Sequence, residues 1–441
     1  MKNIAIIGAG QSGLQLGLSL LQKGYGVTLV NDRTPAEIRK GKVMSSQMLF
    51  HCSLEIEKKA GLNLWEDVCP KLKGIQFKLV QEGETALEWS AGLDHPAWSV
   101  DQRVKLADWF ERFDRQGGRV LIEPGSVALA EKLARTHDLV IIATGKGEMS
   151  RLFGRDPERS TFTTPQRALS LSYVHTGFPP RTTLGFSTVP GVGECFLMPA
   201  LTLSGPCEII VFEGVPGGPL DCWRDVKTPD AHLRQTVALL EQVFPAEAPR
   251  YRHARLTDEG ATLSGGYTPE VRTPVAFLPS GKPVLGMGDA VVLNDPITGQ
   301  GANNAAKCAD VYLERIVAHP GAYDPAWMQQ TFDQYWAYAK WVTAWTNAML
   351  LPPPPHVQRL MGAAAQLPGV AEAFANGFDN PPDLFPWIAD AAEADRFIAA
   401  GGRRQRVPAP APNRPFAECA GSRRVVSRPN PLLPDSTHHK P

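Results

Sequence analysis

The sequence has no excess of charge of either sign, because Lys+Arg and Asp+Glu each number 45 among its 441 residues. A protein held on nucleic acid mainly through phosphate contacts needs a concentrated positive field, so this balance argues against nucleic-acid binding. The chain also lacks an apolar stretch of ~18 residues, so we expect no membrane span. The apolar run at residues 4–7 leads directly into a glycine turn and is too short for a signal peptide, so none is expected.

Paired cysteines are lacking as well. The seven cysteines are odd in number and scattered, and no two of them form a CxxC pair. This pattern indicates neither a disulfide framework nor a zinc module, and we expect no metal site. We therefore expect a reduced, cytoplasmic protein, and at ~150 residues per domain the length corresponds to roughly two or three domains.

The sequence does contain the pattern of an α/β protein. Residues 2–8 include a continuous apolar run, which predicts a buried strand of a parallel sheet. Residues 11–23 carry leucines at helical spacing, with Gly17 where another helix would cross closely, and residues 25–30 predict a second strand. Further buried strands are expected at residues 138–144 and 284–288.

The pattern changes beyond residue 155, where short β-rich runs are broken by Gly and Pro and predict a mostly antiparallel sheet. We expect a discontinuous nucleotide-binding domain over residues 1–155 and 280–320, with a substrate domain, residues 156–279, inserted between its parts. A helical region is expected over residues 321–401. Residues 402–441 are rich in proline and arginine and poor in apolar side chains, so we expect a disordered tail there.

A glycine motif, GAGQSG, lies between the first predicted strand and the first predicted helix. Gly8 allows the tight turn, Gly10 lets a pyrophosphate approach the backbone, and Gly13 allows close packing of helix on strand. With Gln11 and Ser12, the helix N-terminus offers free N–H groups and the positive end of its dipole to phosphates. The motif predicts a site for an ADP-containing cofactor; a glycine turn without a ligand is the alternative.

The end of the second predicted strand departs from the usual pattern. An acidic residue normally closes this strand and binds the ribose hydroxyls. Here Asn31 occupies that position, and Asp32 and Arg33 follow. An Asn side chain can still hydrogen-bond a hydroxyl, so which of these residues holds the ribose stays open.

A second motif indicates a flavin. The predicted strand 284–288 ends in Gly288-Asp289, and an Asp-Pro turn at residues 295–296 then opens a glycine-rich helix start, ITGQGANN. Asp289 can accept hydrogen bonds from a ribityl chain, with a simple loop turn as the alternative. A helix N-terminus at the isoalloxazine C2 carbonyl would stabilise negative charge on a reduced flavin.

Together the two motifs resemble the FAD-binding signature of flavoprotein monooxygenases. The resemblance implies a para-hydroxybenzoate-hydroxylase-like α/β fold, with an FAD-binding Rossmann domain, an inserted mostly antiparallel sheet and C-terminal helices. It also implies an FAD contact from Arg103, for which a surface arginine is the alternative. The expected FAD-binding residues are Gly8, Gly10, Gln11, Ser12, Gly13, Asn31, Asp32, Arg33, Arg103, Thr144, Gly145, Gly288, Asp289, Pro296, Gly299, Gly301, Ala302 and Asn303.

The segment after strand 138–144 narrows the resemblance. Single-component members carry an Asp-Gly pair there, whereas this chain reads ATGKG and is similar to the two-component styrene and indole monooxygenases over about residues 1–390. That similarity implies FADH2 supplied by a separate NAD(P)H-dependent flavin reductase, O2 as co-substrate, a C4a-hydroperoxyflavin as oxygen donor, and a homodimer. The tail is too short to be a fused reductase.

Residues 42–49 lie where that family lines its substrate pocket. Styrene-preferring members carry Asn-x-Val-x-His, whereas Ser45, Gln47 and Leu49 are closer to the Ser-x-Gln-x-Met of the indole-oxidising subgroup. Gln47 can hydrogen-bond an indole N–H, and a buried amide without a partner would cost about 1–3 kcal/mol; alternatively, Ser45 and Gln47 satisfy local backbone groups. Substrate contacts are expected from Met44, Ser45, Gln47, Leu49, Ile75, Pro296 and Ile297, and catalytic orienting roles from Ser45, Ser46 and Gln47.

The resemblance implies an oxygenase that epoxidises indole, giving indoxyl and then indigo, or a styrene-like aryl alkene, with the cofactor carrying the chemistry. Two alternatives stay open: a biosynthetic flavin monooxygenase for a larger indole or aryl substrate, and a binding protein that kept the fold without redox chemistry. A flavin-dependent halogenase is not favoured, because the sequence has no WxWxIP-like segment.

Overall fold

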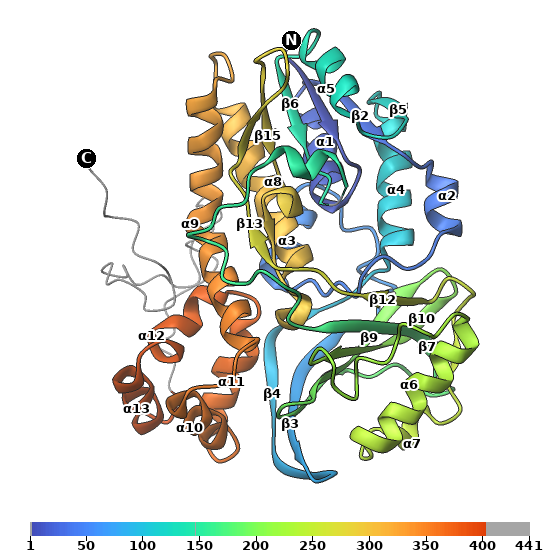
Figure 1. Ribbon diagram of the computed structural model, residues 1–441, viewed down its shortest axis with the longest axis vertical. Coiled ribbons are helices and arrows are strands. Elements are labelled where there is room, and N and C mark those ends of the chain that lie inside the picture. The colour runs from blue at the N-terminus through green and yellow to red at the C-terminus, as the bar shows by residue number, and fades with distance from the viewer. Residues whose placement is uncertain (1, 146, 403–441) are drawn as a thin grey trace.

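The computed structural model describes residues 2–145 and 147–402. Two β-sheets lie one above the other, and a group of helices runs along one side of both (Figure 1). Lys146 and residues 403–441, which hold nearly all of the expected tail, lie outside the described residues. Within the described part of the chain, no helix is long and apolar enough to cross a membrane.

The first sheet contains the predicted nucleotide-binding strands. In spatial order its six strands are β14 (Val275–Phe277), β15 (Pro283–Gly286), β6 (Leu139–Ile142), β1 (Asn3–Ile7), β2 (Gly26–Asn31) and β5 (Arg119–Ile122). All neighbours pair in parallel except β14, which runs antiparallel to β15 at the edge. The strands expected at residues 2–8, 25–30, 138–144 and 284–288 are therefore confirmed.

Six helices surround this sheet. They are α1 (Gln11–Gln22), α2 (Pro35–Lys40), α3 (His51–Lys59), α4 (Gln102–Arg115), α5 (Val127–Ala134) and α8 (Gly301–Val317). Of these, α1 and α5 pack on its strands and the others pack on neighbouring helices. Helix α1 lies between α4 and α8, which explains why four of its five leucines are fully buried. A Cβ at Gly17 would lie 3.1 Å from the Phe113 ring of α4, so the close helix crossing expected at that glycine is confirmed.

The second sheet is mostly antiparallel, as predicted. Its eight strands are β3 (Leu72–Gln81), β4 (Glu84–Ala97), β7 (Ala168–His175), β8 (Thr183–Val189), β9 (Gly193–Thr202), β10 (Gly205–Gly214), β11 (Arg255–Leu256) and β12 (Thr262–Gly265). Only β3 and β8 pair in parallel. Side chains of β9 and β10 alternate between two apolar clusters, because successive residues of a strand point to opposite faces. One cluster packs under α6 (Pro229–Val243) and α7 (Ala248–Tyr251), and the other packs against the C-terminal helical region and the segment before α3.

The division predicted from sequence needs one correction. Residues 1–155 were assigned to the nucleotide-binding domain, but β3 and β4 within them belong to the second sheet. Strand β3 pairs with β8 from Gly74 to Leu79, and the hairpin then returns the chain to α4 in the first domain. A pairing between strands about 110 residues apart leaves no signal in the local sequence pattern.

The C-terminal region is helical, as expected. Its helices are α9 (Pro325–Met349), α10 (Pro355–Ala364), α11 (Pro368–Gly377), α12 (Phe385–Ile388) and α13 (Ala391–Ala399). Helix α9 runs beside the first sheet toward the second, and α11 packs on β4 (Figure 1). The remaining short elements are η1 (Met149–Leu152), β13 (Glu270–Val271), η2 (Gly288–Ala290), β16 (Val292–Leu293), η3 (Pro296–Thr298) and η4 (Pro381–Leu384).

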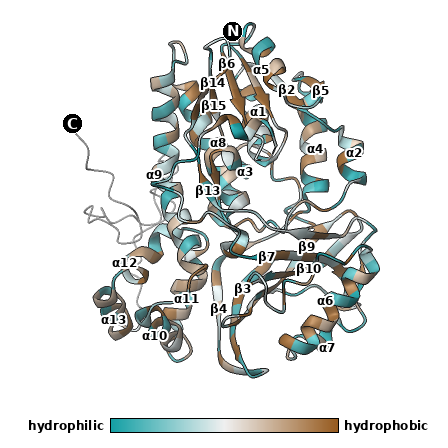
Figure 2. Cartoon of the chain, in the orientation of Figure 1, coloured by the Kyte–Doolittle hydropathy of each residue, from teal (hydrophilic) through white to brown (hydrophobic). Residues whose placement is uncertain are grey.

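Hydropathy follows this architecture. Figure 2 shows the strands of the first sheet as hydrophobic, whereas the peripheral helices α2 and α4 carry many hydrophilic residues. Every buried position of β1 and β6 carries an apolar residue. Helices and neighbouring strands cover both strands, so these side chains have no contact with water.

Candidate functional site

The glycine turn after β1 has the geometry that the sequence motif predicts. Gly8 has a φ of +119°, and a Cβ there would lie 2.8 Å from the backbone of Ala143. A Cβ at Gly13 would lie 2.0 Å from the carbonyl oxygen of Gly8, so helix α1 can sit this close to the strand only without one. A Cβ at Gly10 would meet nothing within 4 Å. The backbone is therefore open at Gly10, where a ligand could approach.

The N-terminus of α1 is available to an anion. Gly10 is the N-cap residue, and no side chain caps the first turn, in which Gln11 and Ser12 are buried. Close by, the Thr144 hydroxyl after β6 is buried without a hydrogen-bond partner among the described residues. A buried hydroxyl of this kind usually has a partner, so its position here fits a bound polar ligand.

The strand ends of β1, β6 and β15 meet at this turn. A Cβ at Gly145 would lie 2.6 Å from the Cβ of Asp289, and a Cβ at Gly288 would lie 2.8 Å from the Ser12 hydroxyl. The Asp289 side chain is exposed at this edge. The two glycine motifs, which are far apart in the sequence, thus form one continuous edge of the sheet.

The residues at the end of β2 lie at the same edge. The Asn31 amide donates to the carbonyl oxygen of Arg33 at 2.7 Å, and the Arg33 guanidinium lies 3.5 Å from the Asp32 carboxylate. Arg33 also donates to the Met44 sulfur at 3.6 Å. Met44, expected to contact substrate, therefore packs beside the predicted ribose-binding residues.

Arg103 has a structural environment that the sequence did not indicate. Its side chain is 1% exposed, and it donates to the Asp101 carboxylate at 2.8 Å and to the Asp258 carboxylate at 2.8 and 2.9 Å. Further bonds reach the Gly41 carbonyl and the Thr202 hydroxyl. Burial opposes the charged form, but the hydrogen bonds and charges of Asp258 and Asp101 outweigh it and raise the pKa of Arg103. These bonds tie the start of α4 to the second sheet, and the FAD contact of Arg103 stays a prediction.

The start of α8 is the second glycine-rich helix end. Gly299 has a φ of +63°, no side chain caps the helix, and a Cβ at Gly301 would meet nothing within 4 Å. The Asn303 carbonyl oxygen accepts from the Phe50 backbone N–H at 3.0 Å, and its amide donates to the Met48 carbonyl at 2.9 Å. Asn303 therefore fastens the segment before α3 to the N-terminus of α8.

These features fit a flavin dinucleotide. The N-terminus of α1 and the open backbone at Gly10 suit its pyrophosphate, and the unpartnered Thr144 hydroxyl lies at the same edge. The N-terminus of α8, open at Gly301, suits a ring that carries negative charge when reduced. The Gln11 side chain joins the two helix ends by donating to the Ala302 carbonyl at 3.3 Å.

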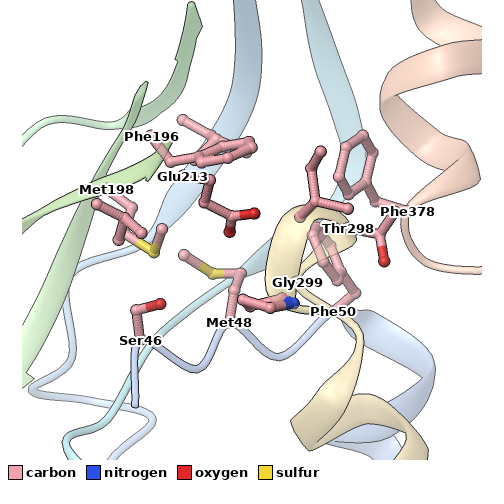
Figure 3. A pocket seen from close by; sticks show the side chains of 13 residues that line it. Ser46, Met48, Phe50, Phe196, Met198, Glu213, Thr298, Gly299 and Phe378 are labelled. Atoms are coloured by element: carbon pink, nitrogen blue, oxygen red, sulfur yellow. The ribbon is translucent and has the colours of Figure 1, made fainter. Parts of the chain in front are cut away.

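A cavity lies between the start of α8 and the second sheet (Figure 3). The space among its lining atoms is about 400 Å³, open solvent included, and the cavity is partly open to solvent. Its walls come from the segment before α3, from strands β8, β9 and β10, and from η3. The 13 lining residues are Ser46, Met48, Phe50, Leu184, Phe196, Met198, Val211, Glu213, Pro296, Ile297, Thr298, Gly299 and Phe378.

The pocket segment presents alternate residues to this cavity. Ser46, Met48 and Phe50 line it, whereas Ser45 and Gln47 do not. The Gln47 amide donates to the carbonyl oxygen of Val100, and its own carbonyl oxygen accepts from the Ser45 hydroxyl at 2.7 Å. The amide is thus satisfied inside the protein, which agrees with the alternative given for Ser45 and Gln47 above.

Among the other predicted substrate residues, some line the cavity and some do not. Pro296 and Ile297 line the cavity, but Leu49 and Ile75 are buried in apolar clusters and do not line it. Substrate contacts from Met44, Ser45, Gln47, Leu49 and Ile75 therefore stay predictions, as do the orienting roles given to Ser45, Ser46 and Gln47.

Sequence reasoning missed the side of the cavity made by the second sheet. Phe196, Met198, Val211 and Glu213 point to one face of β9 and β10, and the intervening residues point to α6. A signal was present, because Glu213 is an acidic residue at the end of an otherwise apolar run, IIVFEG. Buried carboxyl groups without a cation are uncommon and point to function.

The carboxyl group of Glu213 is 1% exposed and lies among other acids. Glu194 is directly opposite it across the β9–β10 pair, and Asp295 lies beside it at the start of η3. The nearest cation, Arg167, is held by Glu194 through two bonds of 2.7 and 3.0 Å. Burial, followed by the negative charge of Asp295 and Glu194, raises the pKa of Glu213 well above its ordinary range. Burial likewise raises the pKa of Asp295 to about 6.

Comparisons with known proteins agree with this architecture. A flavoprotein/dehydrogenase from Cytophaga hutchinsonii superposes with a TM-score of 0.61 at 14% identity, covering 91% of this chain and 96% of that one. The flavin-dependent brominase Bmp2 gives a TM-score of 0.57 at 15% identity, covering 82% and 93%. The chain therefore has the α/β fold of these two flavin-dependent proteins, with a parallel sheet and a second, mostly antiparallel sheet.

The sequence comparisons are more specific. Residues 145–250 match a family described as "Styrene monooxygenase A putative substrate binding domain". Styrene monooxygenase StyA of Pseudomonas fluorescens is 28% identical over 390 residues, which cover 86% of this chain and 93% of that protein; a StyA from another Pseudomonas matches equally. The chain is thus similar to the styrene monooxygenases over most of its length, and residues 145–250 match their substrate-binding domain model.

The open backbone at Gly10 yields a prediction about cofactor affinity. Replacing Gly10 with Ala should leave the thermal unfolding midpoint unchanged, because the added methyl group meets nothing within 4 Å. It should weaken FAD binding by about tenfold or more, because the methyl group occupies the space of the pyrophosphate. Titration calorimetry with FAD measures the affinity. Gly362→Ala, which is also free of contacts and lies on α10, is the matched control; equal affinities for both variants would contradict the site.

The buried carboxyl groups yield a prediction about pH. Since the pKa of Asp295 is about 6 in the fold against an ordinary 3.8, the folded state holds more protons than the unfolded state between these values. The contribution of Asp295 to the free energy of unfolding is therefore complete below about pH 4 and is lost as the pH rises through 6. Asp295→Asn keeps an acceptor for the Ile297 N–H and should flatten this decline in scanning calorimetry from pH 4 to 7. An unchanged slope would contradict the assignment, and the exposed Asp395→Asn serves as control.

Proposed function

We propose that the protein is the oxygenase component of a two-component system that epoxidises indole, or a related aryl alkene, with FADH2 and O2. The observation that supports this most is the position of the cavity. Its wall includes η3 and Gly299, the segment that opens α8, so a substrate in the cavity would lie against the predicted flavin-binding helix end. A mostly apolar cavity beside a flavin is what an alkene oxygenase requires.

Bound reduced FAD would supply the activation of O2 and the oxygen atom that reaches the substrate. The residues proposed to hold it are those named from the sequence, with Gly8, Gly10 and Gly13 at the pyrophosphate and Asp289 at the ribityl chain. Asn303 would act through the backbone of Met48 and Phe50, keeping the cavity wall in register with the flavin site.

The shape and polarity of the cavity support an aromatic substrate. Phe196 stacks on Phe186 with ring centroids 4.7 Å apart, and Phe378 packs edge-on against Trp345 at 4.9 Å. These contacts hold the cavity walls rigid, so that a flat ring can be oriented without reorganising its surroundings. The walls also exclude water from the reacting atoms.

A separate reductase is part of the proposal. Its support is the ATGKG segment after β6, which lacks the aspartate of single-component enzymes, together with the similarity to styrene monooxygenase StyA. The alternative of a larger indole or aryl substrate differs only in what the open side of the cavity admits.

The proposal predicts how the activity divides between two proteins. The purified chain with FAD and NADH should not oxidise NADH, and addition of an unrelated NADH-dependent flavin reductase should start epoxidation of indole and styrene, seen as indigo and styrene oxide. Rapid NADH oxidation by the chain alone would contradict the two-component assignment. Turnover confined to larger aryl substrates would favour the alternative, a biosynthetic monooxygenase, over an indole epoxidase. The Gly10→Ala variant is the control for oxidation by free flavin.

A further inference from the structure

Glu213 is the one ionisable side chain among the residues that line the cavity. Figure 3 shows its carboxyl group directed into the space bordered by Phe196 and Met198 on one side and by Met48 and Thr298 on the other. Among the other lining residues, Ser46 and Thr298 carry hydroxyl groups, and the Thr298 hydroxyl is bonded to Thr346 at 2.7 Å. Glu213 is thus the strongest polar group that a ligand would meet.

The strand pattern places Glu213 there. Residues alternate along β10, so Phe212 packs toward α6 whereas Val211 and Glu213 face the cavity. Glu194 lies opposite Glu213 on β9 and shares that face. Two carboxyl groups directly opposite each other destabilise a sheet unless one is neutral or paired.

Four neighbouring groups decide the charge of Glu213. Glu194 is paired with Arg167, so that cation is already neutralised. Asp295 is a second acid beside Glu213, and the Tyr267 hydroxyl, whose own pKa is raised mainly by burial, lies near both. The Oε2 atom of Glu213 is buried and receives no bond from any N–H or hydroxyl of the described residues.

Burial and the neighbouring acids Asp295 and Glu194 raise the pKa of Glu213 and so favour its uncharged form. The hydrogen bond between the two carboxyl groups adds to the rise that burial causes in the pKa of Glu213, whereas it offsets part of the rise that burial causes in the pKa of Asp295. The shared proton therefore resides on Glu213. The O–H of Glu213 is therefore directed to Asp295. The remaining lone pairs of the carboxyl group are left to accept a hydrogen bond.

We propose that the uncharged carboxyl group of Glu213 recognises the substrate by accepting a hydrogen bond from a ring N–H. It would select N–H-bearing heteroaromatic rings, such as indole, over pure hydrocarbons. This inference rests on the proposed function, because it assigns the polar atom of the same substrate. It also replaces Gln47 in that role, since the amide of Gln47 is occupied by Val100 and Ser45.

Because Glu213 is neutral, its carboxyl group can accept a hydrogen bond from a substrate within an otherwise apolar cavity. A charged carboxylate there would need a cation or water, and either would interfere with an apolar ring. A neutral acid that is held by Asp295 is oriented and costs less to bury. Glu213 is thus a positioning and specificity residue, and no proton leaves it during the reaction.

The test compares indole with N-methylindole, which has the same ring system and no N–H donor. The equilibrium binding of each to the FAD-loaded protein is measured by calorimetry. Wild type should bind indole about tenfold more tightly than N-methylindole, which is the effect of one buried hydrogen bond. Glu213→Leu, which removes the acceptor at similar volume, should bind the two equally. Glu213→Gln retains a carbonyl acceptor and should keep most of the preference.

Turnover supplies the second readout. The ratio of kcat/KM for indole to that for styrene should fall about tenfold in Glu213→Leu, mainly through KM, with FAD affinity unchanged. Equal losses for both substrates, or a preference for indole that survives in Glu213→Leu, would overturn the inference. Glu88→Leu, at an exposed glutamate of β4, is the control.

The binding measurement separates this inference from the proposed function. If wild type binds indole in preference to N-methylindole but oxidises neither, recognition of the ring N–H by Glu213 is supported and the proposed epoxidation is contradicted. If wild type oxidises both equally well and binds them equally, the reaction stands and the role of Glu213 falls. If it binds neither compound, both are overturned.

Discussion

The hydrogen bonds of Asn303 to the backbone of Met48 and Phe50 are the constraint on which the site depends. Asn303 lies in the first turn of α8, and the two backbone groups belong to the wall of the cavity. The cavity and the glycine-rich helix end therefore have one fixed geometry. A flavin bound at the helix end and a ring bound in the cavity would be held at a constant distance, which an oxygen transfer requires.

The two sheets contribute different chemistry to this arrangement. The first sheet brings the ends of β1, β6 and β15 together without side chains at Gly8, Gly145 and Gly288, and so leaves backbone for a cofactor. The second sheet supplies apolar side chains and the acid Glu213. Arg103 links them, because its bonds to Asp258 and Thr202 join α4 to residues of the second domain.

Much of the fold and of the cofactor edge could be predicted from sequence, because both depend on local patterns. The turn at Gly8, the close packing at Gly13 and the buried runs of β1 and β6 follow from the neighbouring residues alone. Strands β3 and β4 could not be placed, because their partner β8 is distant in the chain. For the same reason the cavity wall of β9 and β10 was missed, although Glu213 stood out within its apolar run.

A second limit of prediction from sequence concerns which residues of the pocket segment line the cavity. Ser46 and Met48 do so, whereas Ser45 and Gln47 do not. An extended segment alternates its side chains, and the sequence does not tell which set faces inward. The structure settles this through Asn303, which binds the backbone of Met48 and leaves its side chain on the cavity side. Arg103 shows the same limit, since its two carboxylate partners come from separate segments.

The central claim is that this chain transfers oxygen from O2 to an aromatic alkene with reduced flavin as its only reductant. A single-turnover experiment tests it directly: the protein is loaded with one equivalent of photoreduced FAD, without NADH or reductase, and mixed with indole and ¹⁸O₂. The account predicts one ¹⁸O atom in the oxidised indole and little hydrogen peroxide. Unlabelled indole with a full equivalent of peroxide, as free reduced flavin would give, would contradict it.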